Sequence, residues 1–190
     1  SYSYLADVSD YQSCKEMFAN ITNIYGNVDI LVNNAGISHV GIFTDMVPEE
    51  WDKLINVNIK SCINCTHLAL PKMISRKSGT IINISSIWGE RGASCEAVYS
   101  ATKGAVNSFT KAMAKEVGPS GISVNSIAAG VIDTKMNEFL NPEEKEILTN
   151  EISLMRFGKT NEVADLAVYL ASDRASFVTG QVISADGCMV

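Results

Sequence analysis

The chain has 190 residues, 46% of them hydrophobic, which is enough to bury a substantial core, so we expect one domain over residues 1–190. Its 15 basic and 21 acidic residues give a net charge of −6, which argues against nucleic acid or an anionic membrane surface as a partner. Its apolar runs are shorter than the ~20 residues that span a bilayer, and its first residues form no signal-peptide pattern, so we expect a cytoplasmic protein.

The hydrophobic pattern predicts strands that alternate with helices along the chain. In chain order we expect a strand over 2–8, a helix over 11–25, a strand over 28–33, a helix over 48–75, a strand over 80–84, a helix over 99–117, a strand over 122–127, an irregular segment over 128–141, helices over 142–150 and 161–171, and a strand over 181–184. Strands separated by helices form parallel sheets that are covered on both faces. The sequence therefore predicts an α/β fold with a doubly wound parallel sheet.

Small or polar residues stand at the ends of four predicted strands. They are Asp7, the run Asn34 to Gly36, Ser85 with Ser86, and Ala129 with Gly130. Parallel sheets bind ligands in a crevice beyond the carboxyl ends of their strands. We therefore expect these four groups to line one binding crevice.

Five cysteines are scattered over the chain, an odd number that fits a reducing compartment better than a disulfide framework. Cys62 and Cys65 have the Cys-x-x-Cys spacing of redox and metal sites, and nearby His67 gives a third possible ligand. The surrounding residues read as continuous helix, however, and no second Cys-x-x-Cys follows. We therefore favour packing of these thiols inside a helical core over metal binding or redox chemistry.

Tyr99 and Lys103 stand four residues apart at the start of a predicted helix. Positions i and i+4 share a helix face, so the Lys103 ammonium can lie near the Tyr99 phenol. A neighbouring cation favours the phenolate and lowers the pKa of the phenol towards neutral pH. Tyr99 is then a candidate proton donor for a reduction, and Ser86, at the end of a strand, is a candidate donor to a substrate oxygen that gains negative charge.

Four motifs follow one another in the order found in the short-chain dehydrogenase/reductase family, which the chain resembles over nearly its whole length. They are Asn33-Asn34-Ala35-Gly36, Asn56-Val57-Asn58, Asn83-Ile84-Ser85-Ser86 and Tyr99-x-x-x-Lys103. The resemblance implies a Rossmann-like fold and a nicotinamide-dependent carbonyl reductase with no metal. It also implies that Asn58 holds a water linked to Lys103, that Ser86 polarises the carbonyl, that Tyr99 transfers the proton, and that Lys103 binds the nicotinamide ribose.

The same resemblance implies NADP, or NAD, as the cofactor and indicates which residues touch it. Asp7 and Val8 resemble the pair that contacts adenine. Asn34, Ala35 and Gly36 resemble the turn that passes the adenosine ribose, where glycine permits close backbone approach. Ile132 and Thr134 match positions at the nicotinamide carboxamide.

The chain departs from the family pattern in two places. Ala129-Gly130 stands where the family usually has Pro-Gly, which loosens the loop but keeps its hydrogen-bonding backbone. The 190 residues also contain no glycine-rich Thr-Gly-x-x-x-Gly-x-Gly turn, because they begin at what resembles the third strand. We expect two βα units of roughly 30 residues each to be missing, so that the sheet is N-terminally incomplete, this chain alone binds a dinucleotide poorly and is inactive, and the choice between NAD and NADP cannot be read.

Within the family the chain is most similar to the 3-oxoacyl-[acyl-carrier-protein] reductases, which implies a carrier-bound ketone substrate and a place in fatty acid biosynthesis. Residues 86–96 and 131–137 are also similar to segments of the elongation factor P 5-aminopentanone reductases. Trp88, Glu90 and Glu96 are then candidates for binding an amine-bearing ketone. Reductions of other small-molecule ketones, such as sugars and steroids, stay open.

A non-catalytic protein that keeps the sheet as an interaction scaffold is the rival from another class. Retention of Asn58, Ser86, Tyr99 and Lys103 together argues against it. The resemblance further implies a homodimer or homotetramer, with two-fold interfaces made by the helices over 48–75 and 99–117 and by the apolar C-terminal end. We also expect residues 128–141, with the helix over 142–150, to form a mobile substrate lid.

Overall fold

The computed structural model describes residues 2–189, and within this range it contains one sheet of four parallel strands. The strands are β1 (Ile30–Asn33), β2 (Gly79–Ser86), β3 (Ile122–Ala129) and β4 (Val182–Ala185), and they lie side by side in chain order. The α/β class and the parallel sheet predicted from the sequence are therefore confirmed.

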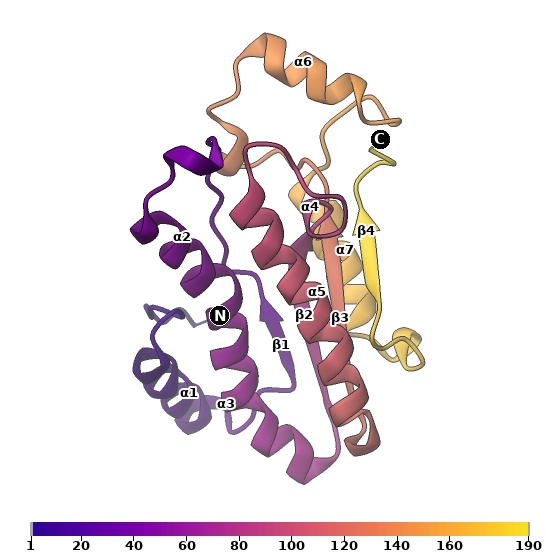
Figure 1. Ribbon diagram of the computed structural model, residues 1–190. Coiled ribbons are helices and arrows are strands. Elements are labelled where there is room, and N and C mark those ends of the chain that lie inside the picture. Colours follow the sequence, from indigo (N-terminus) through magenta and orange to yellow (C-terminus); the bar gives the residue numbers. More distant parts are fainter. Residues whose placement is uncertain (1, 190) are drawn as a thin grey trace.

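Helices cover both faces of the sheet (Figure 1). The α-helices are α1 (Tyr11–Tyr25), α2 (Pro48–Ile55), α3 (Ser61–Arg76), α4 (Trp88–Arg91), α5 (Ala97–Val117), α6 (Pro142–Asn150) and α7 (Thr160–Leu170). Short 3₁₀ turns are η1 (Phe43–Asp45), η3 (Gly118–Ser120), η4 (Lys135–Asn137) and η5 (Asp173–Ala175). Figure 1 shows α3 and α5 in front of the sheet, α7 behind it, and α6 beyond the carboxyl ends of the strands.

The two central strands carry apolar side chains on both faces, because each face is covered by helices. Ile81 and Val124 pack towards α1, α3 and α5, whereas Ile82 and Ile127 pack towards α7. All four are completely buried. Because all four strands are parallel, their carboxyl ends lie together at one end of the sheet.

A polar network runs through the core on the α3 and α5 side. Asn33 Nδ2 donates to Asn83 Oδ1 at 2.8 Å and to Thr66 Oγ1 at 3.2 Å, and Asn83 Nδ2 donates to Thr110 Oγ1 at 2.8 Å. Asn83 and Thr110 are fully buried, so these bonds replace those that water would otherwise make. The network ties β1, β2, α3 and α5 together directly beneath the carboxyl ends of the strands.

The long helix predicted over 48–75 exists, but it is not a regular α-helix throughout. Between α2 and α3 lies one π-helical segment, η2 (Asn56–Lys60). A π turn inserts an extra residue into the helix and is often found at functional sites. Asn58 lies in the middle of it.

The predicted strand over residues 2–8 is wrong. Residues 2–7 have no regular secondary structure, and residues 8–10 form a turn that leads into α1. A segment becomes a strand only by pairing with a neighbour, and none of the described residues pairs with it. The Asp7 carboxylate instead accepts from the backbone N–H of Ser9 at 2.9 Å, and Asp10 caps α1 by accepting from the N–H of Ser13.

Other boundaries move by a few residues. β2 reaches Ser86 and β3 reaches Ala129, so these residues end their strands rather than follow them. α5 begins at Ala97, ahead of Tyr99. Across residues 2–189, none of the helices has the length and apolar character needed to cross a membrane.

Candidate active site

Four buried polar side chains meet where β2 ends and α5 begins. Ser86 is the last residue of β2, Asn58 comes from η2, and Tyr99 and Lys103 lie on the first turns of α5. Each is less than 10% exposed. The four residues singled out by the sequence motifs are therefore brought to one place in the fold.

Lys103 is held under the sheet edge by a backbone acceptor. Its Nζ donates to the carbonyl oxygen of Ile84 at 2.9 Å and lies 5.7 Å from the centroid of the Tyr99 ring. No carboxylate is recorded as its partner within residues 2–189. Burial therefore lowers the pKa of Lys103 to about 8.

The Asn58 side chain makes three of its four possible hydrogen bonds within the protein. Its Nδ2 donates to the carbonyl oxygen of Ile37 at 2.9 Å and to Thr102 Oγ1 at 3.1 Å, while its Oδ1 accepts from the Ile37 N–H at 2.8 Å. Thr102 Oγ1 in turn donates to the Tyr99 carbonyl at 2.7 Å. Asn58 thereby fixes the loop after β1 against α5, a link through Thr102 that sequence analysis missed although Thr102 lies inside the Tyr-x-x-x-Lys motif.

The pKa of the Tyr99 phenol is raised, whereas the sequence predicted that it would be lowered. Burial raises its pKa, a hydrogen bond with Ser86 acts in the opposite direction, and Glu96 adds to the rise. The expected lowering by Lys103 is not found, because the Lys103 ammonium is directed at the Ile84 carbonyl rather than at the phenol oxygen. Ser86 Oγ accepts from the N–H of Trp88 at 3.2 Å, which leaves the Ser86 proton available to another oxygen.

Helix α4 packs against the backbone of α5 at Lys103. A Cβ on Gly89 would come within 2.6 Å of the carbonyl carbon of Lys103 and within 2.8 Å of the N–H nitrogen of Gly104. Only glycine permits this approach, so Gly89 helps to set where Lys103 lies. The glycine follows the serine motif closely in sequence, but nothing in the sequence shows what it touches.

A cavity of about 360 Å³ opens in front of Ser86 and Tyr99. Its walls are largely apolar and come from α4, the segment after β3, and α6; they include Trp88, Met136, Phe139, Ile147 and Leu148. Glu96 and Glu144 also line it, and Glu144 is engaged in capping α6 through Asn141. Glu96 is half-buried, and burial raises the pKa of its carboxyl group. Glu90 does not line this cavity.

The family model described as Enoyl-(Acyl carrier protein) reductase matches residues 1–189. A 3-oxoacyl-[acyl-carrier-protein] reductase of Thermotoga maritima is 42% identical over 187 residues, which are 98% of this chain and 76% of that protein. The chain belongs to the short-chain dehydrogenase/reductase family. It is accordingly an NAD(P)-dependent oxidoreductase that acts on ketones.

Other members of the family agree in sequence and in fold. A 3-oxoacyl-[acyl-carrier-protein] reductase of Staphylococcus aureus is 40% identical over 189 residues, with 100% of this chain and 77% of that protein covered. The crystal structure of a 3-oxoacyl-[acyl-carrier protein] reductase from Brucella melitensis superposes with a TM-score of 0.90 at 36% identity, covering 96% of this chain and 69% of that one. The Rossmann-like fold is thus confirmed.

The side of this reductase site next to Lys103 has room for a nicotinamide cofactor. A Cβ on Gly36 would lie 3.3 Å from Lys103 Nζ and 3.5 Å from Asn58 Oδ1, so the bare glycine keeps space open beside both groups. Gly36, Ser38, Lys135 and Phe139 line a cavity of about 550 Å³ there. The residues present therefore fit a ribose that hydrogen-bonds to Lys103.

The other residues expected at the cofactor lie further out. Ile132 and Thr134 are on the segment after β3, where the Ile132 carbonyl accepts from Asn137 Nδ2 at 2.7 Å. Asp7 and Val8 form the turn before α1, and the Val8 carbonyl accepts from Asn64 Nδ2 at 3.1 Å. Within residues 2–189, none of these four makes a hydrogen bond or an ion pair with the side chains of Ser86, Tyr99, Lys103 or Asn58. Asn34 and Ala35 immediately precede Gly36 in the loop after β1.

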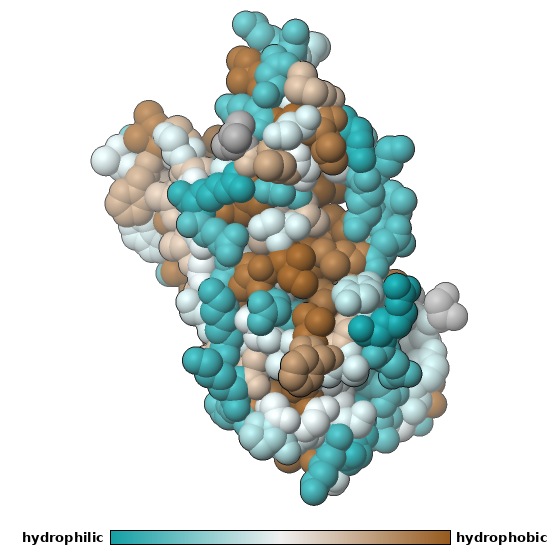
Figure 2. Space-filling model, turned by 90° about the vertical axis from the view of Figure 1, so that its right-hand side faces the viewer, coloured by the Kyte–Doolittle hydropathy of each residue, from teal (hydrophilic) through white to brown (hydrophobic). Residues whose placement is uncertain are grey.

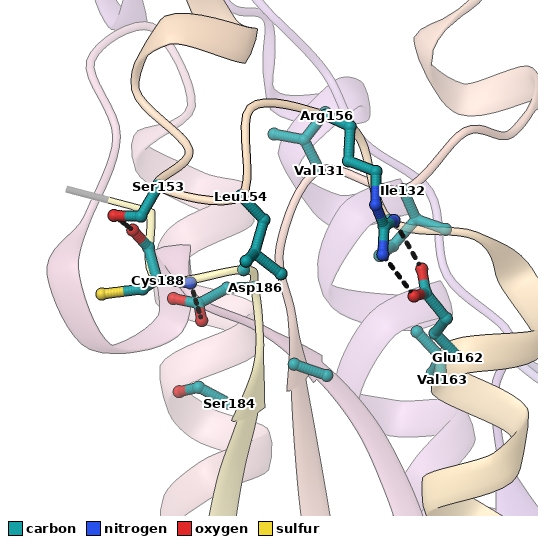
Figure 3. A pocket seen from close by; sticks show the side chains of 13 residues that line it. Val131, Ile132, Ser153, Leu154, Arg156, Glu162, Val163, Ser184, Asp186 and Cys188 are labelled. Carbon is teal, nitrogen blue, oxygen red and sulfur yellow. Dashed lines mark hydrogen bonds and ion pairs between the residues drawn. The ribbon is translucent and has the colours of Figure 1, made fainter.

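A second cavity, of about 470 Å³, lies beside the ends of β3 and β4 (Figure 3). Ile132 and Val131 line it, together with an ion pair between Arg156 and Glu162 at 2.6 Å and with the C-terminal residues Asp186 and Cys188. Neither Ser86 nor Tyr99 lines it. Residue Ile132 therefore faces this cavity rather than the one that contains the catalytic candidates.

The Cys-x-x-Cys pair lies inside α3, as the helical reading predicts. Cys62 Sγ donates to Asn83 Oδ1 at 3.3 Å, and Cys65 Sγ lies 4.0 Å from Cys14 Sγ of α1. Burial raises the pKa of both Cys62 and Cys65 to about 12, so both thiols stay protonated at neutral pH. His67 instead accepts or donates a hydrogen bond with the Tyr11 hydroxyl at 3.0 Å.

Proposed function

We propose that this enzyme reduces the ketone of a 3-oxoacyl thioester borne by an acyl carrier protein, with NADPH as the hydride donor. The observation that carries the proposal is that Ser86 and Tyr99 face one cavity while Lys103 and Asn58 stand behind them. The relatives named as 3-oxoacyl-[acyl-carrier-protein] reductases support this substrate class.

The positions of the side chains support a role for each residue. The nicotinamide supplies a hydride to the carbonyl carbon when it is bound. Tyr99 gives its phenolic proton to the carbonyl oxygen, so that the ketone becomes a secondary alcohol. Ser86 donates a hydrogen bond to the same oxygen as negative charge builds on it. Lys103 holds the nicotinamide ribose, and its Nζ lies 5.7 Å from the centroid of the Tyr99 ring.

Asn58 acts by holding other parts of the site in place. Because both ends of its side chain are engaged by Ile37 and Thr102, it keeps the loop after β1 and the start of α5 in register. We place the water that links Lys103 to solvent beside this residue. Asp7, Val8, Asn34 and Ala35 complete the adenosine side of the cofactor site, and Ile132 and Thr134 its carboxamide side.

The test uses the full-length enzyme with a short 3-oxoacyl thioester as substrate. Tyr99→Phe removes the transferable proton and keeps the ring, so turnover should fall by about 10²-fold or more while the dissociation constant for NADPH, measured by fluorescence, stays within about twofold. Tyr25→Phe, at an exposed position on α1, is the matched control and should turn over like the parent. Parent-like turnover by Tyr99→Phe would show that another group supplies the proton.

A second candidate substrate is an amine-bearing ketone, such as 5-aminopentanone attached to elongation factor P. The observation that favours it is Glu96, a half-buried carboxyl in the catalytic cavity with no basic residue lining the same cavity among those described. A substrate ammonium would pair with this carboxylate and relieve the cost of its burial. Glu96 therefore offers a recognition point that an uncharged acyl chain does not need.

KM values measured on both substrates distinguish the two candidate functions. If the amine-bearing ketone is the substrate, Glu96→Gln should raise its KM by about tenfold and leave the KM of the 3-oxoacyl thioester unchanged. Glu90→Gln, on the exposed side of α4, is the control and should change neither KM. Equal effects of Glu96→Gln on both substrates would remove the reason for the second candidate.

A further inference from the structure

The short helix α4 contacts Ser86, the backbone of α5 and the C-terminal segment 186–189. On one side the Trp88 N–H donates to Ser86 Oγ at 3.2 Å. On another side Gly89 lies against the backbone of Lys103 and Gly104. The Trp88 side chain packs on a cluster that includes Ile152 and Met189, and the Arg91 side chain makes polar bonds to the same distant part of the chain.

The Arg91 guanidinium joins α4 to the C-terminal segment 186–189. It forms an ion pair with the Asp186 carboxylate at 3.2 Å and donates to the carbonyl oxygen of Met189. The Asp186 side chain is only 10% exposed, and its second oxygen accepts from the Cys188 N–H at 3.1 Å. Asp186 also lies so close to Gly130, which lines the catalytic cavity, that a Cβ there would come within 2.6 Å of the Asp186 Cα.

The same C-terminal segment carries the base of the substrate lid. The N–H of Ser153 donates to the Cys188 carbonyl at 3.2 Å, and the N–H of Leu154 donates to the Gly187 carbonyl at 3.2 Å. The Ser153 hydroxyl adds a bond to the Cys188 carbonyl at 2.8 Å, which Figure 3 shows beside the Asp186 carboxylate. Ile152 pairs with Met189 in an antiparallel bridge. These residues directly follow α6, whose Ile147 and Leu148 line the catalytic cavity.

We propose that Arg91 is a positioning residue that couples the substrate lid to the catalytic serine. Through Asp186 and Met189 it connects the base of α6 with α4, and through α4 it fixes the N–H of Trp88 on the Ser86 hydroxyl. Closure of the lid over a ketone then aligns the Ser86 hydroxyl with the substrate oxygen. The inference rests on the proposed function for the identity of the reaction, but the mechanical link between lid and α4 does not.

The link is expected to affect turnover more than stability. The Arg91 side chain is 42% exposed, and ion pairs at such positions contribute little to the free energy of folding. Alignment of a group that acts on the transition state is more sensitive, because small displacements at the reacting atoms cost large factors in rate. Substitution of a residue that only stabilises the fold would lower the free energy of unfolding and leave kcat largely unchanged.

The experiment compares Arg91→Met, Asp186→Asn and the double variant in the full-length enzyme. Each single variant should lower kcat on the order of tenfold, with the NADPH dissociation constant unchanged, and the double variant should be no worse than the single ones because both belong to one unit. Arg91→Lys, which keeps the charge, should recover part of the lost kcat. Parent-like kcat in Arg91→Met, or additive losses in the double variant, would overturn the proposal.

Arg156→Met is the matched control. Arg156 is similarly exposed and also ion-paired, but its partner Glu162 lies on α7, and the two side chains bond to each other, to Phe157 and to Lys159 rather than to α4. Its kcat should stay within about twofold of the parent. A loss equal to that of Arg91→Met would mean that removal of any ion-paired arginine is harmful and would also overturn the proposal.

Hydrogen exchange separates failure of this inference from failure of the proposed function. In Arg91→Met the amides of Ser153 and Leu154 and those of α4 should lose protection together, whatever substrate the enzyme takes. If the parent reduces neither ketone but this joint loss is seen, the substrate proposal is wrong and the coupling stands. Loss at only one of the two places means that Arg91 does not couple them.

Discussion

Lys103 is an ammonium buried in the protein with a backbone carbonyl as its recorded partner. The Ile84 oxygen accepts from it, but a carbonyl replaces only part of the hydration that a charge loses on burial. The folded state therefore favours neutral Lys103 more than the unfolded chain does, and this explains why its pKa falls to about 8. At neutral pH Lys103 keeps its charge at a cost to stability.

The pH dependence of stability tests this cost. Between pH 8 and 10.5 the unfolded chain keeps a proton on Lys103 that the folded protein has released, so the contribution of Lys103 to the free energy of unfolding rises with pH through this window. Lys103→Met has no such proton. Its thermal midpoint should equal or exceed that of the parent at pH 7, and the difference should shrink or reverse by pH 10.5. A difference that does not change with pH would contradict a lowered pKa.

Single residues show where sequence reasoning succeeds and where it ends. Asn58, Ser86, Tyr99 and Lys103 could be predicted because each motif places a specific functional group at a fixed spacing. The direction of the Lys103 ammonium could not be predicted, because it depends on the backbone carbonyl of Ile84, which no sequence pattern indicates. The same holds for Arg91, whose partner lies 95 positions away along the chain.

At the scale of elements, the contact between α4 and α5 leaves no space for a larger residue. Gly89→Ala would place a methyl group against the backbone of Lys103 and Gly104, where no side chain can rotate away. We expect α4 to shift, with a loss of about 1–3 kcal/mol in the free energy of unfolding and a lower kcat because Ser86 and Lys103 both move. Urea titration and steady-state kinetics measure the two effects.

Gly118→Ala is the matched control for Gly89→Ala. Gly118→Ala, where a Cβ meets nothing within 4 Å, should leave both stability and kcat close to the parent. If Gly89→Ala behaves in the same way, α4 is not held against α5 as closely as the structure indicates.

The segment that covers the catalytic cavity has few bonds to the rest of the protein. From the end of β3 to the end of α6 it contains only η4 and α6 as regular elements among the described residues, and Phe139 and Ile147 stay more than half exposed. We predict that its amides exchange with solvent at least about tenfold faster than those of Ile81 and Ile82 in β2. Equally slow exchange in both places would rule out a mobile lid.

Elements were easiest to predict where local signals and burial agree. The helix over 11–25 has an N-cap aspartate at Asp10 and a glycine at its end, and it has the predicted bounds. The segment 2–8 has the composition of a strand but no partner in the sheet, and composition carries no information about partners. The π turn at Asn56–Lys60 is invisible in the sequence because a helical hydrophobic pattern tolerates one inserted residue.

At the scale of the whole molecule, apolar surface indicates assembly. Figure 2 looks at the side on which β4 forms the edge of the sheet, and apolar side chains gather across the middle of that face. Elsewhere Phe43 and Ile55 stay exposed beside an apolar groove between α2 and α5. Surfaces of this kind are typical of protein interfaces.

We therefore predict a homodimer or homotetramer in solution. Light scattering across the micromolar range should give at least twice the mass of one chain. Ile55→Glu, which places a charge at the groove beside α5, should lower the mass, whereas Lys53→Glu, on the same helix but away from the groove lining, should not. A monomer at all concentrations would refute the prediction.

The Arg91 contacts also indicate the order in which parts of the molecule form during synthesis of the chain. The strands of the sheet follow one another in the chain, so each can add to its predecessor as the polypeptide is synthesised. Asp186 and Met189 come after all four strands in the chain, and so the bond from α4 to the base of the lid can form only after β4 has been synthesised. A nascent chain that has reached β4 already possesses all four catalytic candidates, yet it gains the connection between lid and serine only when residues 186–189 have been added.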